Sequence, residues 1–167
     1  MTHPLVLALF RDRRSAAEAA AAVRELGIDR GDLSVVCRSH HDEEILAREV
    51  GGTPGAEIED SRPAARLGEL GGQIVAAIAL VLPGIGPIVA AGPLSADFGE
   101  AAGHLAGGIA TVLGRAGLPE HLAAAWQRRV NDGDVVLGVH VRAAEAAAVA
   151  GALQQHGADD VEIAQWE

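Results

Sequence analysis

The chain contains a single cysteine, Cys37, and very few aromatic residues. One cysteine excludes an intramolecular disulfide framework. Aromatic side chains make up 2% of the 167 residues and tyrosine is absent, while the 21 glycines are about twice the usual share. We therefore expect small side chains to dominate the core, which lets neighbouring backbones approach closely.

Positive charge is also scarce. Thirteen basic residues stand against 23 acidic ones, which gives a net charge of −10 and an isoelectric point of about 5.1. The compact basic cluster Arg11, Arg13 and Arg14 has Asp12 inside it. Because binding to a phosphate backbone requires a basic patch, we expect no nucleic-acid partner and interpret this cluster as a solvated turn between a strand and a helix.

The two ends of the chain match each other without a gap when the sequence is shifted by 130 residues. Each copy has an apolar run, an alanine-rich stretch with helical spacing, a glycine that ends it (Gly27 or Gly157) and a second apolar run. The pattern predicts strands at 5–10, 33–37, 135–141 and 161–164, and helices at 15–26 and 143–156. Each copy is therefore expected to be a strand–helix–strand unit.

Two such units in series predict an α+β fold of the ferredoxin-like, split βαβ type, a two-layer sandwich of four strands and two helices. Residues 1–38 and 134–167 would form this domain, with residues 39–133 inserted between its second and third strands. The two helices cover one face of the sheet. We expect the insertion or another subunit to cover the other face.

The insertion combines an acidic linker at 53–63 with an apolar segment at 65–117 that is rich in glycine and proline. No charged residue occurs from Leu70 through Ala96. Because the prolines from Pro83 to Pro87 should end a helix, we predict a mostly helical hairpin. Its parts would be helices at 65–82 and 95–116 around a short apolar segment at 88–92, followed by a helix at 119–130.

Small residues recur at every fourth position in both expected hairpin helices. The two rows are Gly68, Gly72 and Ala76, and Gly99, Gly103 and Gly107. Residues four apart share a helix face, and a glycine inside a helix costs about 1 kcal/mol relative to alanine. We therefore predict that these rows form a glycine zipper, in which helices pack at close range within the hairpin and between subunits.

Three surroundings would cover such a hairpin: a second copy of the chain, a lipid bilayer or the rest of the monomer. A membrane-spanning helix needs about 20 continuous apolar residues, and the run from Leu70 to Leu82 is shorter. The N-terminal apolar run at 5–10 is also too short for a signal peptide. We therefore expect a cytoplasmic homo-oligomer, with membrane association through a re-entrant hairpin as the alternative.

Several segments resemble the heat-induced, YflT-type family of small bacterial general-stress proteins, which carry a glycine-zipper insertion. The resemblance depends on the residues at 5–10 with the alanine-rich helix and Gly27, and on those at 33–36, 83–87, 90–94, 117–120 and 133. It covers most of the chain except the acidic linker. The resemblance implies expression under stress and no established enzymatic activity, and it supplies no catalytic residues.

Few residues suggest catalysis or metal binding. Glu100 and His104 lie four apart, a spacing that suits metal ligation, but two ligands do not make a site. His140 takes the place of Phe10 in the repeat, at a strand end, where we expect a half-buried structural histidine. Cys37 is expected to be a small buried hydrophobe, with a nucleophile assisted by neighbouring basic residues as the alternative.

Two functions follow from these patterns. The first is a non-enzymatic, stress-related assembly protein that self-associates through the glycine-zipper hairpin and needs no cofactor or small-molecule substrate. The second is a small ligand- or metal-binding enzyme with a pocket between the sheet and the insertion, which would require convergent polar groups in one cleft.

Overall fold

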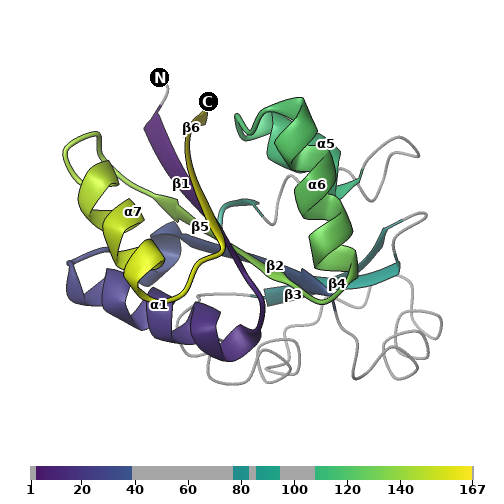
Figure 1. Cartoon of the computed structure of the whole chain (residues 1–167), viewed down its shortest axis with the longest axis horizontal. Helices are drawn as coiled ribbons and strands as arrows, with labels where there is room; N and C mark the ends of the chain where they lie inside the picture. The colour runs from purple at the N-terminus through teal and green to yellow at the C-terminus, as the bar shows by residue number, and fades with distance from the viewer. Residues whose placement is uncertain (1–2, 39–76, 83–85, 95–107, 167) are drawn as a thin grey trace.

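In the computed structural model the described residues are 3–38, 77–82, 86–94 and 108–166. They form one antiparallel sheet of six strands in the order β3-β4-β2-β5-β1-β6, with helices on both faces (Figure 1). The strands are β1 (His3–Phe10), β2 (Leu33–Arg38), β3 (Ala77–Leu82), β4 (Gly86–Ala91), β5 (Val135–His140) and β6 (Asp160–Trp166). The helices are α1 (Arg13–Glu25), α5 (Ile109–Arg115), α6 (Glu120–Asn131) and α7 (Ala146–Gln155), with a 3₁₀ turn at Arg30–Asp32.

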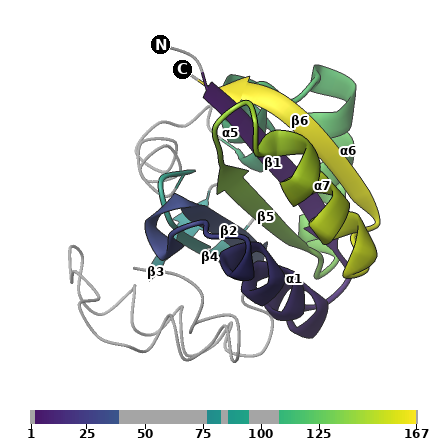
Figure 2. The same ribbon diagram turned by 90° about the vertical axis from the view of Figure 1, so that its left-hand side faces the viewer.

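The α+β class and the elements expected from the repeat are confirmed. All four predicted strands lie in one sheet, where β5 pairs with both β1 and β2, and β1 also pairs with β6. The predicted helices correspond to α1 and α7, which lie side by side on one face (Figure 2). Gly27 and Gly157 have φ values of +96° and +90°, the left-handed conformation that ends a helix and that glycine adopts at little cost.

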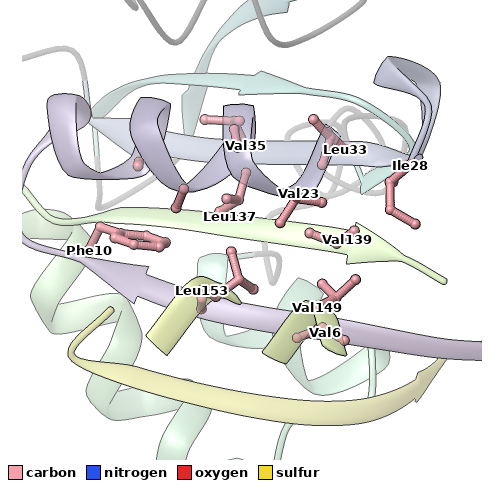
Figure 3. Packing of buried hydrophobic residues seen from close by; sticks show 14 of the residues in the cluster. Val6, Phe10, Val23, Ile28, Leu33, Val35, Leu137, Val139, Val149 and Leu153 are labelled. Carbon is pink, nitrogen blue, oxygen red and sulfur yellow. The ribbon is translucent and has the colours of Figure 1, made fainter. Parts of the chain in front are cut away.

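The face under α1 and α7 forms the first core. Figure 3 shows Val23 of α1, together with Val149 and Leu153 of α7, packed against side chains of β1, β2 and β5. The core holds many alanines, which agrees with the low aromatic content. Asp12 caps α1, because its Oδ1 accepts a hydrogen bond of 2.7 Å from the backbone N–H of Ser15.

The opposite face of the sheet is covered by α5 and α6, two helices of the insertion. Leu5, Leu7 and Leu9 of β1 pack there, while the alternate residues of β1 face α1 and α7. The molecule therefore has three layers: the strands and helices of the repeat form two of them, and the insertion covers the remaining face of the sheet, one of the two alternatives expected from the sequence. Burial on both faces explains why residues 5–10 form a continuous apolar run rather than an alternating one.

The prediction of a helix at 65–82 is wrong for residues 77–82, which form β3, and the apolar segment at 88–92 belongs largely to β4. These two strands form a hairpin, and β4 pairs with β2, so the hairpin extends the sheet. Each uncharged segment is only six residues long and contains β-branched side chains, which favour strands over helices. The insertion is therefore less helical than predicted.

Pro87 fits inside β4 because of its place in the register. It lies opposite Val81 of β3, whereas the pairing of β4 with β2 begins one residue later, at Ile88 and Arg38. Among the described residues Pro87 therefore pairs with β3 alone, and its missing N–H removes no hydrogen bond to the described residues of β2.

The last two helices of the insertion are close to their predicted positions. The helix expected at 119–130 is α6, and the end of the one expected at 95–116 is α5. Among the described residues, no helix combines the length and the apolar character needed to cross a lipid bilayer.

Candidate functional site

The residues predicted from the glycine rows lie outside the described residues, as do the two weak metal-ligand candidates. They are Gly68, Gly72, Ala76, Gly99, Gly103 and Gly107, and Glu100 and His104. Their proposed roles in helix packing, or in metal binding, therefore stay predictions. Among the described residues, the clusters of polar side chains lie at the two ends of the sheet.

Three rings from three strands meet at the end of the sheet where β1 begins and β6 ends. Nε2 of His3 and Nδ1 of His140 are 3.0 Å apart and share a hydrogen bond whose direction depends on the tautomers. The ring of Trp166 lies edge-on to both, with centroids 5.2 Å from His3 and 4.4 Å from His140. In both ribbon views the start of β1 and the end of β6 lie side by side (Figures 1 and 2).

His140 is the buried member of this cluster. It is 7% exposed, so the prediction of a structural histidine at a strand end fits its position, although it is more deeply buried than expected. Its Nε2 is buried as well, and no hydrogen-bond partner for this atom exists among the residues that the structure describes. Burial, and secondarily the neighbouring His3, lowers the pKa of His140 to about 4, so the ring is neutral at pH 7.

A cavity of about 410 Å³ adjoins the two histidines. Its wall is completed by the segment between α1 and β2, with Asp29 and Asp32, and by the segment after β5. There the guanidinium of Arg142 donates to Glu145 at 2.6 Å, and this bond lowers the pKa of the Glu145 carboxyl. The cavity is therefore lined by two imidazoles, three carboxylates and one guanidinium.

The cluster can exchange hydrogen bonds and protons, but its ligand set is too small for a metal centre. Within the described ranges, no three His, Cys, Asp or Glu side chains are grouped so that they could hold a metal ion. A second cavity, of about 480 Å³, is lined by residues of α5 and α6 such as Thr111, Gly114 and Glu120. The residues of the sheet do not line it.

The roles of His3 and Trp166 could not be recognised from the sequence. The predicted strand at 161–164 ended before Trp166, and the one at 5–10 began after His3. In the structure β1 and β6 are longer at this end, and their register places His3 directly opposite Trp166. A prediction that the first and last strands pair in antiparallel fashion along their whole length would have placed His3 opposite Trp166.

At the opposite end of the sheet, charged side chains join α6 to the strands. Asp159 accepts hydrogen bonds from Arg11 and Arg129, and both lower the pKa of its carboxyl. Arg129 also pairs with Asp134 at 2.6 Å, yet burial outweighs this contact and raises the pKa of Asp134. These groups are already paired with one another, so we interpret the network as a structural link.

Cys37 is not suited to nucleophilic catalysis. It is 1% exposed within the first core, and burial raises the pKa of its thiol to about 11. The thiol is therefore protonated at neutral pH, whereas a nucleophilic cysteine needs the thiolate. The interpretation of Cys37 as a small buried hydrophobe agrees with this environment.

The site geometry is thus a pair of hydrogen-bonded imidazoles with a tryptophan at one end of the sheet and an ion-pair network at the other. Comparisons of the chain with protein-family models, with curated proteins and with solved structures gave no match.

Proposed function

We propose that this chain is a non-enzymatic, stress-related assembly protein that self-associates through its apolar insertion. The observation that carries the proposal is β3, a strand of six uncharged residues at one edge of the described sheet. An edge strand has N–H and C=O groups that can pair with another chain, and proteins usually protect such edges with charge. Two copies of β3 can pair in antiparallel fashion around a two-fold axis.

The charge of the two sheet edges favours β3 over β6 for this contact. The strand β6, at the other edge, contains Asp160 and Glu162. In a chain with a net charge of −10, two acidic edges would repel each other, whereas two copies of β3 bring no charge together. The two glycine rows would add helix contacts to the same interface.

We infer a ferredoxin-like domain as the base of this assembly. What supports it is the order β2-β5-β1-β6 of the four strands from the repeat, with α1 and α7 on one face. The insertion would then serve as the element that associates, and the link to stress comes from the resemblance to heat-induced general-stress proteins. A cytoplasmic location belongs to the same proposal, with membrane association as the alternative.

A charge placed within β3 tests the assembly. We expect Ala79→Lys to weaken self-association about tenfold or more, equivalent to about 1.4 kcal/mol, because it puts like charges into the strand pair. Native mass spectrometry with and without detergent would report the number of subunits and any bound lipid. The matched control is Ile163→Lys on β6, a residue that is 50% exposed and should leave the mass unchanged.

If Ala79→Lys keeps the native mass, or if Ile163→Lys lowers it, the edge β3 is not the interface. A mass that is monomeric in both the unmodified chain and the variants would contradict self-association itself. Far-ultraviolet circular dichroism of each variant checks that the fold is retained.

The glycine row after Pro93 gives an independent test. We expect Gly103→Leu to disrupt the assembly and to promote aggregation, because a leucine would prevent close approach of helices at the row. A solvated helix would instead gain stability from the same change, since leucine is a better helix former than glycine. An unchanged oligomeric mass together with a higher melting temperature would contradict the packing role.

A further inference from the structure

We propose that the cluster of His3, His140 and Trp166 is a proton-controlled clasp, which holds the end of β6 on the sheet at neutral pH and releases it in acid. This inference is independent of the self-association proposed above. It depends on how the three rings connect three strands at one end of the sheet.

The clasp acts at the C-terminal end of a strand that has one strand neighbour in the described sheet. Within the described sheet β6 is an edge strand and pairs with β1 alone. The ring of Trp166, at the end of β6, reaches across β1 to within 4.4 Å of the ring of His140 on β5, measured between centroids. Trp166 therefore ties the end of β6 to the strand beyond its neighbour.

The hydrogen bond between the two histidines requires that at least one of the facing nitrogens has no proton. When both rings are protonated, Nε2 of His3 and Nδ1 of His140 carry N–H groups that face each other across 3.0 Å. In the tautomer in which Nδ1 of His140 donates to His3, protonation also adds an N–H at Nε2, an atom that is buried and has no partner in the described part of the chain. Both effects favour a state in which the cluster opens to water.

Other charged groups near the cluster do not remove this cost. Asp29 and Asp32 are exposed on the cavity rim, where solvent weakens their attraction to a buried charge. Glu145, on the segment after β5, is already paired with Arg142. Arg142 itself is positive and opposes a further cation at the cavity.

The direction of the pH effect follows from the two protonation states. The pKa of His140 is about 4 in the closed cluster, and its ordinary value is 6.5. The free energy that favours the closed state over the open state therefore has its full value above pH 6.5. It decreases as the pH falls from 6.5 towards 4, because the open state binds the proton more tightly. Across this interval the ratio of open to closed molecules should rise by about 80-fold, and it approaches a limit of ~300-fold at still lower pH.

Release of Trp166 would have a structural consequence. Trp166 packs against the second core cluster, the one formed by the sheet with α5 and α6. When the end of β6 leaves the sheet, apolar surface beside Ala164 becomes accessible. Acid would thus expose an apolar patch without unfolding the first core.

Fluorine NMR of the chain labelled with 5-fluorotryptophan provides the test. The chain has two tryptophans, so Trp126, which is 2% exposed on α6, serves as an internal reference. We expect the Trp166 signal to move towards its solvent-exposed position as the pH falls below 6.5, while the Trp126 signal stays in place.

Two variants and one matched control complete the experiment. His140→Phe keeps an aromatic ring and cannot be protonated, so the Trp166 transition should disappear. His3→Gln removes the charge that helps to lower the pKa of His140 in the closed cluster, so protonation favours opening less and the midpoint should move to lower pH. His156→Phe makes the same exchange as the first variant at an exposed position, the C-terminal cap of α7, and should change neither.

The clasp is wrong if the Trp166 signal is the same at pH 7 and pH 4. It is also wrong if the transition persists in His140→Phe, or if both tryptophan signals move together as in global unfolding. Because His3→Gln predicts a shift of the midpoint rather than a loss, it decides the question even where His140→Phe does not fold.

Discussion

Gly92→Ala is expected to destabilise the protein by about 3 kcal/mol or more, the largest effect of a single methyl group in this fold. Gly92 follows β4 and has a φ of +80°, a conformation that side chains with a Cβ rarely adopt. A Cβ at this position would lie 1.9 Å from the carbonyl oxygen of Leu33 and 2.7 Å from Cα of Ser34. Both atoms belong to the backbone of β2, which pairs with β4 and β5 and cannot move aside.

The neighbouring contacts explain why the chain must pass so close to β2. Leu94, two residues later, is fully buried in the second core. Its backbone N–H donates to the buried hydroxyl of Ser34 at 3.1 Å. The close approach at Gly92 thus brings the insertion back onto the sheet at the start of β2.

Urea unfolding, followed by circular dichroism, would measure the loss as a lower free energy of unfolding. Gly151→Ala in α7 is the matched control, since a Cβ there meets no atom within 4 Å and φ is not positive. That change should stabilise the protein by up to about 1 kcal/mol. A Gly92→Ala variant within about 0.5 kcal/mol of the unmodified chain would contradict the close approach to β2.

Trp126→Ala is expected to cost about 3–5 kcal/mol. Trp126 is 2% exposed and is one of the largest buried side chains, and it packs α6 against the sheet in the second core. Its Nε1 also donates a hydrogen bond of 3.0 Å to Asp160 at the start of β6. The substitution would leave a cavity and remove the donor for that carboxylate.

Trp126→Phe separates the two contributions. Phenylalanine keeps most of the packing and removes the hydrogen bond, so the loss should fall to about 1–2 kcal/mol. Urea unfolding of both variants gives the comparison. If Trp126→Ala costs less than about 1 kcal/mol, then α6 does not contribute to the core in the way that the structure describes.

The sequence by itself determined the elements whose signals are local. In each copy an alanine-rich stretch with helical spacing lies between two apolar runs, and this pattern predicted four strands and two helices. Gly27 and Gly157 marked where the helices end. Two helices on one face also left the other face of the sheet to be covered, and the insertion covers it. These features depend on neighbours along the chain, so residue order is enough to reveal them.

The tertiary structure decided what the uncharged insertion becomes. Residues 77–82 are apolar throughout, so no periodicity separated a buried helix from a strand, and the pairing of β4 with β2 settled the choice. The cluster of His3, His140 and Trp166 exists because the strand register brings together residues more than 130 positions apart. Such contacts follow from long-range hydrogen bonding between strands, which no local pattern of side chains encodes.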